Sequence, residues 1–171
     1  MQFVGFHGTD VRGARQIESD GFHDSSAESW LGPGIYFFET QSAFDGLEAA
    51  RWWVTTYKRY PEWVILEAEI NSMKVMDLFG NSEDRKKFGV VKQRLLKKHL
   101  ESNGNEENFE LKTVFLLLSR KLEVIRSLVD AARLNKFTNF VVGNPQIQIC
   151  VTKSSCIGKA TIKEKGKLYY G

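Results

Sequence analysis

The sequence has few of the residues that build metal centres and disulfide-stabilised folds. It contains only two cysteines, Cys150 and Cys156, and three histidines at positions 7, 23 and 99, which lack the spacing of a ligand set. Two isolated thiols are typical of small core residues rather than of a disulfide or a metal site. The scattered histidines argue against zinc. We therefore expect a protein without a metal.

Long apolar runs are also missing. No stretch approaches the length that spans a membrane, and the N-terminal residues MQFVGFHGTD contain neither a basic region nor the apolar core of a signal peptide. We therefore expect a mature cytoplasmic protein that does not enter a membrane. Repeats and low-complexity linkers are absent too, and 171 residues suffice for one domain with a real core. The sequence thus predicts a single domain over residues 1–171.

The charge is small overall but unevenly distributed. The formal net charge is +3. Between positions 85 and 98 there are basic residues and no acidic one: Arg85, Lys86, Lys87, Lys92, Arg94, Lys97 and Lys98. A second cluster near the end of the chain contains Lys159, Lys163, Lys165 and Lys167. Such clusters suit a polyanion because phosphate contacts release counterions, although a run of charge is more often a solvated helix face.

The periodicity of apolar residues predicts both strands and helices. Strands are expected at 3–6, 35–38, 62–70, 74–78, 140–142 and 147–151, with a closing hairpin of 160–162 and 167–170 around Lys165-Gly166. Helices are expected at 11–19, capped by Thr9-Asp10, and at 42–57, 83–100 and 111–134. The last two form a mainly helical insert at about 80–135. This pattern predicts an α+β domain.

Two short motifs near the N-terminus carry the main functional signal. FHGT occupies residues 6–9, and GIYF occupies residues 34–37. In each motif a glycine stands beside a polar or aromatic residue at the edge of a short apolar run, where it permits close approach of the backbone. His7 and Tyr36 are flat side chains that form hydrogen bonds. Two such strand edges side by side would make a slot for a flat polar ring.

FHGT, Gly21-Phe22, GIYF and Ser42-Ala43 together resemble the ADP-ribosyltransferases of the diphtheria-toxin and poly(ADP-ribose) polymerase branch. The likeness is greatest to small bacterial members, which include toxin, toxin–antitoxin and phage-defence types. It is dense over residues 3–53, weaker over 64–78 and 137–157, and missing over about 80–135. The resemblance implies two small, mainly antiparallel sheets packed at an angle, with flanking helices and an NAD cleft between them.

The resemblance also implies roles for individual residues. His7 is expected to bind a ribose hydroxyl of NAD, and Gly8 to pair through its main chain with the nicotinamide carboxamide. Thr9 supports that turn. Tyr36 is expected to stack on the nicotinamide, and Ser42 to contact the carboxamide. For His7 and Tyr36 the alternative is a purely structural role, and Ser42 better suits the N-cap of the helix that it opens.

Two positions of the family have more than one candidate in this chain: the second stacking aromatic and the late catalytic residue. Phe44 or Trp52 could provide the second ring, although Trp52 and Trp53 are more often core residues. The family places a glutamate at the start of a late strand, where it bonds the ribose 2′-hydroxyl and helps the nucleophile. Residues 137–151 contain no glutamate, and the best match is Gln148, with Asn139 and Gln146 as alternates.

A glutamine at this position changes the expected chemistry. It can bind the ribose but cannot act as a general base, so transfer of one unit remains feasible whereas polymer growth does not. Glu39 or Asp10 could supply a carboxylate instead, although each better suits a solvated or capping role. We therefore expect a mono-ADP-ribosyltransferase, an enzyme of the glycosyltransferase class that uses NAD as co-substrate and acts as a toxin or defence effector.

The target is expected to be a macromolecule. Nucleic acid, RNA or DNA, is favoured over protein because the basic segment 85–98 and the aromatic residues Trp52, Trp53 and Tyr57 suit phosphates and bases. The same groups suit an antitoxin-like or acidic protein partner. Two alternatives stay open. One is an inactive member of the fold that binds NAD, ADP-ribose or nucleic acid without turnover. The other is a basic nucleic-acid-binding domain in which the motifs occur by chance.

Overall fold

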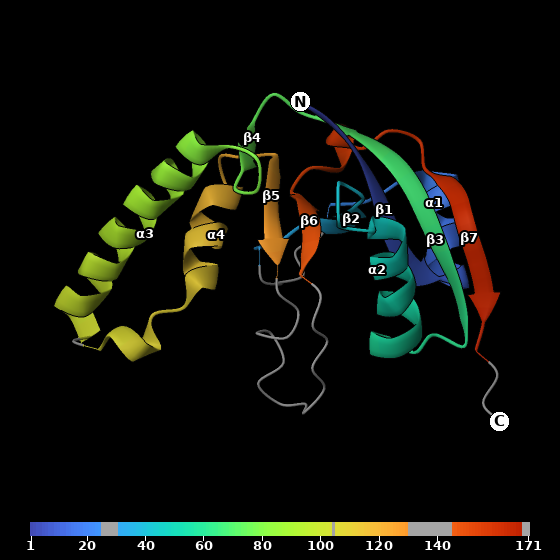
Figure 1. The fold of residues 1–171 in the computed structure, drawn as a ribbon, viewed down its shortest axis with the longest axis horizontal. Coiled ribbons are helices and arrows are strands. Elements are labelled where there is room, and N and C mark those ends of the chain that lie inside the picture. Colours follow the sequence, from blue (N-terminus) through green and yellow to red (C-terminus); the bar gives the residue numbers. More distant parts are fainter. Residues whose placement is uncertain (25–30, 104, 130–144, 169–171) are drawn as a thin grey trace.

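A computed structural model describes residues 1–24, 31–103, 105–129 and 145–168 (Figure 1). Its strands are β1 (Gln2–Asp10), β2 (Ile35–Glu39), β3 (Glu62–Asn71), β4 (Val75–Asp77), β5 (Val124–Val129), β6 (Gln146–Val151) and β7 (Thr161–Lys167). Its α-helices are α1 (Val11–Asp20), α2 (Gly46–Trp52), α3 (Ser82–Asn103) and α4 (Leu111–Ser119). A π-helical turn, Trp53–Tyr57, continues α2, and short 3-10 turns lie at Glu106–Asn108 and Ser154–Cys156. The chain is therefore α+β, as predicted.

The strands form one mixed sheet in the order β4-β5-β6-β2-β1-β3-β7. The expectation of two separate sheets was wrong, because β1 and β2 still pair and so join the two halves. Their pairing is confined to the register pair Phe6 and Phe38 among the residues described. By contrast, β1 pairs with β3 from Gln2 to Asp10. This long ladder extends β1 beyond the predicted end, so His7 and Gly8 lie inside the strand rather than at its edge.

Helices cover both faces of the half of the sheet that contains β1 and β3. Trp63 and Ile65 of β3 pack in a cluster with Ala50 of α2, whereas Val64 and Leu66 pack with Ala14 of α1. Because successive strand residues point to opposite faces, α1 and α2 must lie on opposite sides of β3. The predicted N-cap of α1 is confirmed, since the Asp10 carboxylate accepts a hydrogen bond of 2.6 Å from Gly13 N.

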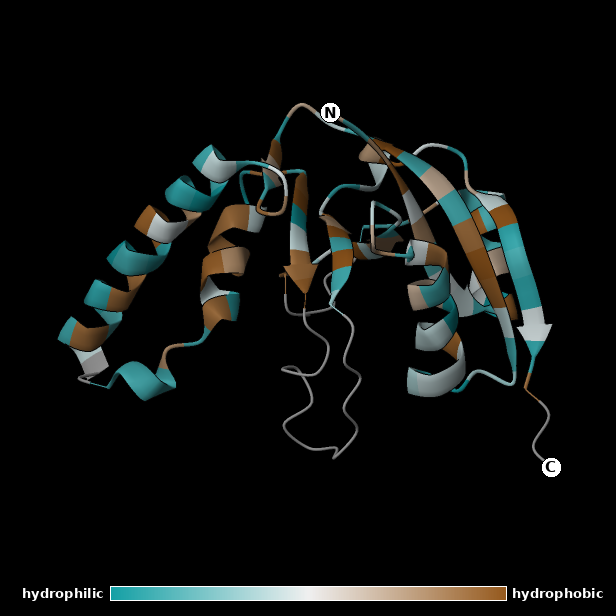
Figure 2. Cartoon of the chain, viewed as in Figure 1, coloured by the Kyte–Doolittle hydropathy of each residue, from teal (hydrophilic) through white to brown (hydrophobic). Residues whose placement is uncertain are grey.

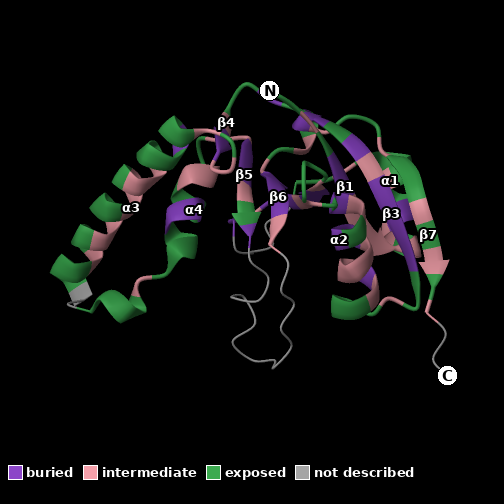
Figure 3. Ribbon diagram, viewed as in Figure 1, coloured by how far each residue is buried: buried purple, intermediate pink, exposed green. Residues whose placement is uncertain are grey.

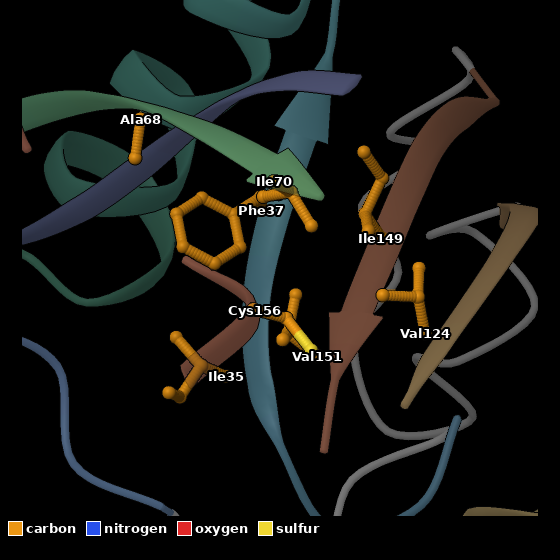
Figure 4. Packing of buried hydrophobic residues seen from close by; sticks show 8 residues of the cluster. All are labelled: Ile35, Phe37, Ala68, Ile70, Val124, Ile149, Val151 and Cys156. Atoms are coloured by element: carbon orange, nitrogen blue, oxygen red, sulfur yellow. The ribbon is translucent and has the colours of Figure 1, made fainter. Parts of the chain in front are cut away.

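The core cluster in Figure 4 joins the two halves of the sheet. Its buried members come from β2, β3, β5, β6 and the short turn after β6: Ile35, Phe37, Ala68, Ile70, Val124, Ile149, Val151 and Cys156. Both cysteines are free and buried, as expected for core residues. Figure 3 shows the same concentration of buried residues in the central strands. The Phe37 ring, fully buried, fills the space beside the junction of β1 and β2.

The long helix predicted at 111–134 was wrong over residues 120–129, and residues 130–134 lie outside the described residues. Residues Val124–Val129 form β5, which lies between β4, to which it is parallel, and β6, to which it is antiparallel. Val124 and Ile125 are fully buried there. A strand buried in the middle of a sheet shows a run of apolar residues rather than alternation, so its pattern can be mistaken for a helix. The predicted strand at 140–142 lies outside the described residues.

The helix predicted at 42–57 begins later than expected. Its N-cap is Asp45, whose carboxylate accepts hydrogen bonds from Leu47 N and Glu48 N at 3.0 and 3.1 Å. Ser42 lies upstream in a tight turn closed by two backbone hydrogen bonds between Gln41 and Phe44. It has a φ of 54° and is exposed. The expectation that Ser42 caps this helix was therefore wrong.

The predicted closing hairpin is also absent from the described residues. Strand β7 runs without a turn from Thr161 to Lys167 and pairs antiparallel with β3. Gly166 lies directly opposite Trp63, and a Cβ at Gly166 would come within 2.4 Å of Trp63 Cζ2. The glycine is therefore required by the neighbouring indole ring rather than by a turn.

Replacing Gly166 with alanine is expected to lower the free energy of unfolding by about 1–3 kcal/mol, because the new methyl group overpacks the site of Trp63. Urea denaturation measures the change. The control is Lys165→Ala, which adds no atom on the same strand and should shift the free energy by less than about 0.5 kcal/mol. Equal stability of the two variants would contradict the prediction.

Helix α3 lies at the end of the molecule remote from α1, α2 and β7 (Figure 1). Figure 2 shows that it is mostly hydrophilic, in contrast to α4. One face of α3 carries half-buried apolar residues: Phe88, Val91, Leu95 and Leu96. Phe88 packs on Phe115 of α4 with ring centroids 5.1 Å apart. Within the described part of the chain, no helix is both long enough and apolar enough to cross a bilayer.

Candidate functional site

A cleft of about 730 Å³ lies between β1 and β2 where the two strands separate. One wall contains His7, Gly8 and Thr9 of β1, and the other contains Tyr36 of β2 and Gln148 of β6. Strands β1, β2 and β6 are neighbours, since β2 lies between the other two in the sheet. The fold therefore brings together five of the predicted site residues although they are far apart in the sequence.

His7 is held at the cleft wall by a hydrogen bond to the opposite strand. Its Nδ1 lies 2.9 Å from the carbonyl oxygen of Tyr36. A carbonyl oxygen only accepts, so Nδ1 must carry the proton and donate. The rings of Phe22 and Phe37 pack against the imidazole at centroid distances of 5.3 and 5.5 Å. The imidazole thus bridges the two strands at the point where their ladder is interrupted.

The environment of His7 favours the neutral imidazole. Burial lowers the pKa of His7, and the hydrogen bond to the Tyr36 carbonyl opposes this effect only in part. With a proton on Nδ1 alone, Nε2 carries a lone pair. His7 can therefore accept a hydrogen bond from a hydroxyl group of a ligand.

The lowered pKa of His7 predicts a pH-dependent stability. The unfolded state binds a proton near the ordinary pKa of 6.5, whereas the folded state resists protonation until a lower pH. Stability is therefore full above 6.5 and is lost as the pH falls towards the lowered pKa. Thermal unfolding at about pH 7.5 and about pH 5.5 measures this loss, which should be smaller in His7→Asn. Identical pH dependence of stability in the wild type and in His7→Asn would show that His7 does not cause the loss.

Tyr36 lines the cleft, and its side chain also packs against the core cluster that contains Leu31 and Cys150. The hydroxyl donates a hydrogen bond of 2.5 Å to Gly32 O and accepts one of 3.1 Å from Leu31 N. These bonds fix the ring against the loop that precedes β2. A fixed aromatic face at a cleft wall suits stacking on a flat ring.

Gly8 lies against the π-helical turn that follows α2. A Cβ at this position would come within 2.5 Å of Val54 Cγ1 and 3.1 Å of Ala50 O. The wall of the cleft can therefore approach the helix only because residue 8 lacks a side chain.

Gly8→Ala is expected to lower the free energy of unfolding by about 1–3 kcal/mol and to displace the Trp53–Tyr57 turn from the cleft. Urea denaturation measures the first effect. Gly89→Ala is the matched control, because nothing lies within 4 Å of a Cβ at this position of α3. Helix propensity predicts that it raises stability by up to about 1 kcal/mol. If Gly89→Ala lowered the stability and Gly8→Ala did not, the steric requirement for glycine at position 8 would be refuted.

Gln148 is the late residue that reaches the cleft. The residue is only 4% exposed, and it lies opposite Phe38 on the neighbouring strand. Gln146 begins β6 opposite Val129 and is not among the described residues of the cleft wall, and Asn139 lies outside the described residues. The amide of Gln148 can donate and accept hydrogen bonds but cannot take up a proton as a base.

Three predicted contacts are not brought to the cleft. Ser42 is exposed in its turn, and Phe44 packs against Phe79 with centroids 5.8 Å apart. Trp52 contacts Tyr57 at 6.2 Å, but its neighbour Trp53 is the tryptophan that lines the cleft. The suggested carboxylates have structural roles: Asp10 caps α1, and Glu39 binds Arg126.

Arg126 is the centre of a buried ionic network beside the cleft strands. Its side chain is 5% exposed. Nε donates to Glu39 at 2.6 Å, Nη1 to both oxygens of Asp77 at 3.0 Å, and Nη2 to Gln41. Asp77 also accepts hydrogen bonds from the backbone N–H groups of residues 79 and 80. The network therefore ties β5 to β2 and β4.

The remaining wall contains Trp53 and Tyr57, which the sequence pattern assigned to a nucleic acid target, and Lys58, which it did not single out. Trp53 and Tyr57 stack with centroids 4.4 Å apart and an interplanar angle of 16°. Lys58 Nζ lies 5.3 Å from the Trp53 ring centroid. The described residues of the cleft wall include no aspartate or glutamate. The wall therefore suits a ligand that combines flat rings with negative charge.

No protein-family model matches the chain, and neither a curated protein nor a solved structure matches it. Among the residues that the structure describes, no group of three or more histidines, cysteines, aspartates or glutamates could hold a metal ion. The residues and geometry of the cleft are therefore the evidence that bears on the function.

Proposed function

We propose that this chain is a mono-ADP-ribosyltransferase that cleaves NAD between nicotinamide and ribose and transfers ADP-ribose to a macromolecule, as an effector of the toxin or defence type. The convergence of His7, Gly8, Thr9, Tyr36 and Gln148 on one cleft carries this proposal. His7, Gly8, Thr9 and Tyr36 belong to the two sequence motifs, and Gln148 is the best match to the late family position. Only a fold that places β1, β2 and β6 side by side brings them together. The cleft volume, about 730 Å³, is in the usual range of small-molecule sites.

The reaction breaks one bond at the ribose C1′ and makes another. The bond to the nicotinamide nitrogen breaks, and its electron pair leaves with nicotinamide and neutralises the ring. A lone pair of the acceptor forms the new bond to C1′, and the acceptor's proton passes to water. Positive charge develops on the ribose as in glycoside cleavage. Holding the ribose and the departing ring in place is then the main task of the protein.

The side chains of the cleft suit that task. His7 Nε2 can accept a hydrogen bond from a ribose hydroxyl, and the Tyr36 ring can stack on nicotinamide. The Gln148 amide can bind the ribose. Because a glutamine cannot remove a proton, the proposed activity is transfer of a single unit and does not include polymer growth.

A second candidate is an inactive member of the same fold that binds NAD or ADP-ribose without turnover. The observation that favours it is the lack of a carboxylate among the described residues of the cleft wall. The two candidates share a ligand and differ in whether nicotinamide is released.

The test is nicotinamide release from NAD by the purified protein, alone and with RNA, DNA or cell lysate, together with NAD binding by calorimetry. We expect release that falls in Tyr36→Ala, which removes the ring, and persists in part in Tyr36→Phe, which keeps it. NAD binding without release would establish the inactive candidate. A protein that does not bind NAD would refute both.

A further inference from the structure

Trp53, Tyr57 and Lys58 line the edge of the cleft, and Arg59 follows them in the chain. These four residues, here called the aromatic rim, have no role in the chemistry above. Tyr57 is 48% exposed, and the side chains of Lys58 and Arg59 are exposed. Trp53 and Tyr57 are stacked, and the Lys58 ammonium lies 5.3 and 5.8 Å from the centroids of their rings. Water solvates the faces of stacked aromatic rings poorly, and the neighbouring cations attract anions. Such a surface therefore suits a planar anion.

The local backbone creates this arrangement. In the π-helical turn Trp53–Tyr57 the first and last residues come into register, so the two rings stack face to face. Arg59 follows with a φ of 54°, a conformation that residues with a Cβ seldom adopt. Such local departures from regular structure often lie at functional sites.

Trp53 connects the rim to the interior of the cleft. Its ring packs on Phe38 at 6.2 Å, and its Cδ1 would lie 3.5 Å from a Cβ placed on Gly8. Tyr57 lies on the other side of the stack, towards solvent. A planar group stacked on the rim would therefore lie beside the wall that contains Gly8.

The charge of the rim points to a polyanion. Residues 52–61 include two tryptophans, two tyrosines, a lysine and an arginine, and no acidic residue. The basic helix α3 is a weaker candidate, because Lys86 and Lys87 form ion pairs with Glu83 and Asp84 of the same helix. Helix α3 also lies at the far end of the molecule from α2 (Figure 1).

We propose that the aromatic rim binds single-stranded nucleic acid and presents one of its bases to the cleft as the acceptor of ADP-ribose. Bases of any sequence can stack on exposed aromatic rings while cations contact the phosphates. The acceptor role rests on the proposed function: a base nitrogen would form the bond to C1′ as nicotinamide leaves, and its proton would pass to water. The binding itself does not depend on turnover.

Binding is tested without NAD, by fluorescence anisotropy of short labelled single-stranded RNA and DNA oligonucleotides. Tyr57→Ala is expected to weaken binding by about tenfold, whereas Tyr57→Phe, which keeps the stack, should stay within about twofold. Lys58→Ala should reduce the slope of log affinity against log salt by about one. The matched control is Lys98→Ala on α3, which removes the same charge from an exposed position remote from the rim.

The outcomes separate this inference from the proposed function. Nicotinamide release in the same preparations reports on the enzyme, and oligonucleotide binding reports on the rim. Release without binding of either oligonucleotide would overturn the inference and leave the enzyme intact. Binding that Tyr57→Ala does not weaken, or that Lys98→Ala weakens more than Lys58→Ala does, would overturn it too. Binding without release would confirm the surface and remove the acceptor role.

Discussion

Replacing His7 with asparagine is expected to reduce nicotinamide release about 100-fold while leaving the fold intact. The asparagine amide nitrogen can take the place of Nδ1 and donate to the carbonyl oxygen of Tyr36, which His7 now contacts at 2.9 Å. No atom of asparagine reaches the position of Nε2, so the hydrogen bond to the ribose hydroxyl is lost. Release of nicotinamide is measured at saturating NAD, and stability is measured by thermal unfolding.

The control for this experiment is His7→Ala, which removes both hydrogen bonds. It should lose the same activity and in addition about 1 kcal/mol of stability, because the Tyr36 carbonyl loses its donor. The comparison separates the strand-bridging role of Nδ1 from the ligand-binding role of Nε2. Wild-type turnover by the asparagine variant would show that Nε2 does not bind the substrate.

Replacing Arg126 with methionine is expected to lower the free energy of unfolding by about 3–5 kcal/mol. The guanidinium is almost fully buried, and its loss leaves the carboxylates of Glu39 and Asp77 without their cation. Uncompensated charge in an apolar interior is far more costly than the loss of a surface ion pair. Urea denaturation measures the effect.

The double variant Arg126→Met with Glu39→Gln provides the control. Removing the charge of Glu39 together with its partner should recover part of the stability, so that the double variant loses less than the two single variants combined. Strictly additive losses would mean that the pair, although 2.6 Å apart, is not energetically coupled.

Two strands were predicted well because their local signals are strong. Residues Ile35–Glu39 and Glu62–Asn71 form β2 and β3 close to the predicted bounds. Strand β5 was missed because both of its edges are paired and its residues Val124 and Ile125 are buried, which removes the alternation that marks a strand. No local feature indicates that residues 124–129 enter the sheet between β4 and β6.

The candidate site was predicted only in part, because some of its residues carry a local signal in the sequence and others do not. The motifs identified His7, Gly8, Thr9 and Tyr36 because each lies in a short segment whose glycine is visible in the sequence. Ser42 was assigned from the resemblance of the Ser42-Ala43 pair, and Phe44 was one of two candidates for the second ring. A tight turn reverses the chain between Gln41 and Phe44, and no local sequence signal indicated it.

The aromatic wall depends on geometry that composition does not reveal. Trp52 and Trp53 are adjacent and chemically equivalent in the sequence. Only the π-helical turn decides that Trp53 stacks on Tyr57 at 4.4 Å and lines the cleft. The different roles of the two tryptophans therefore follow from this one π-helical turn.

The order of the strands in the sheet has a consequence for the newly made chain. The cleft takes one wall from residues 7–9 and another from residue 148, and β6 must pair with β2 before that wall exists. Contacts between residues so distant in sequence form slowly and late in folding. A ribosome-bound chain that lacks β6 therefore cannot have a complete cleft, and any activity of the protein begins only after nearly all of this sequence has been translated.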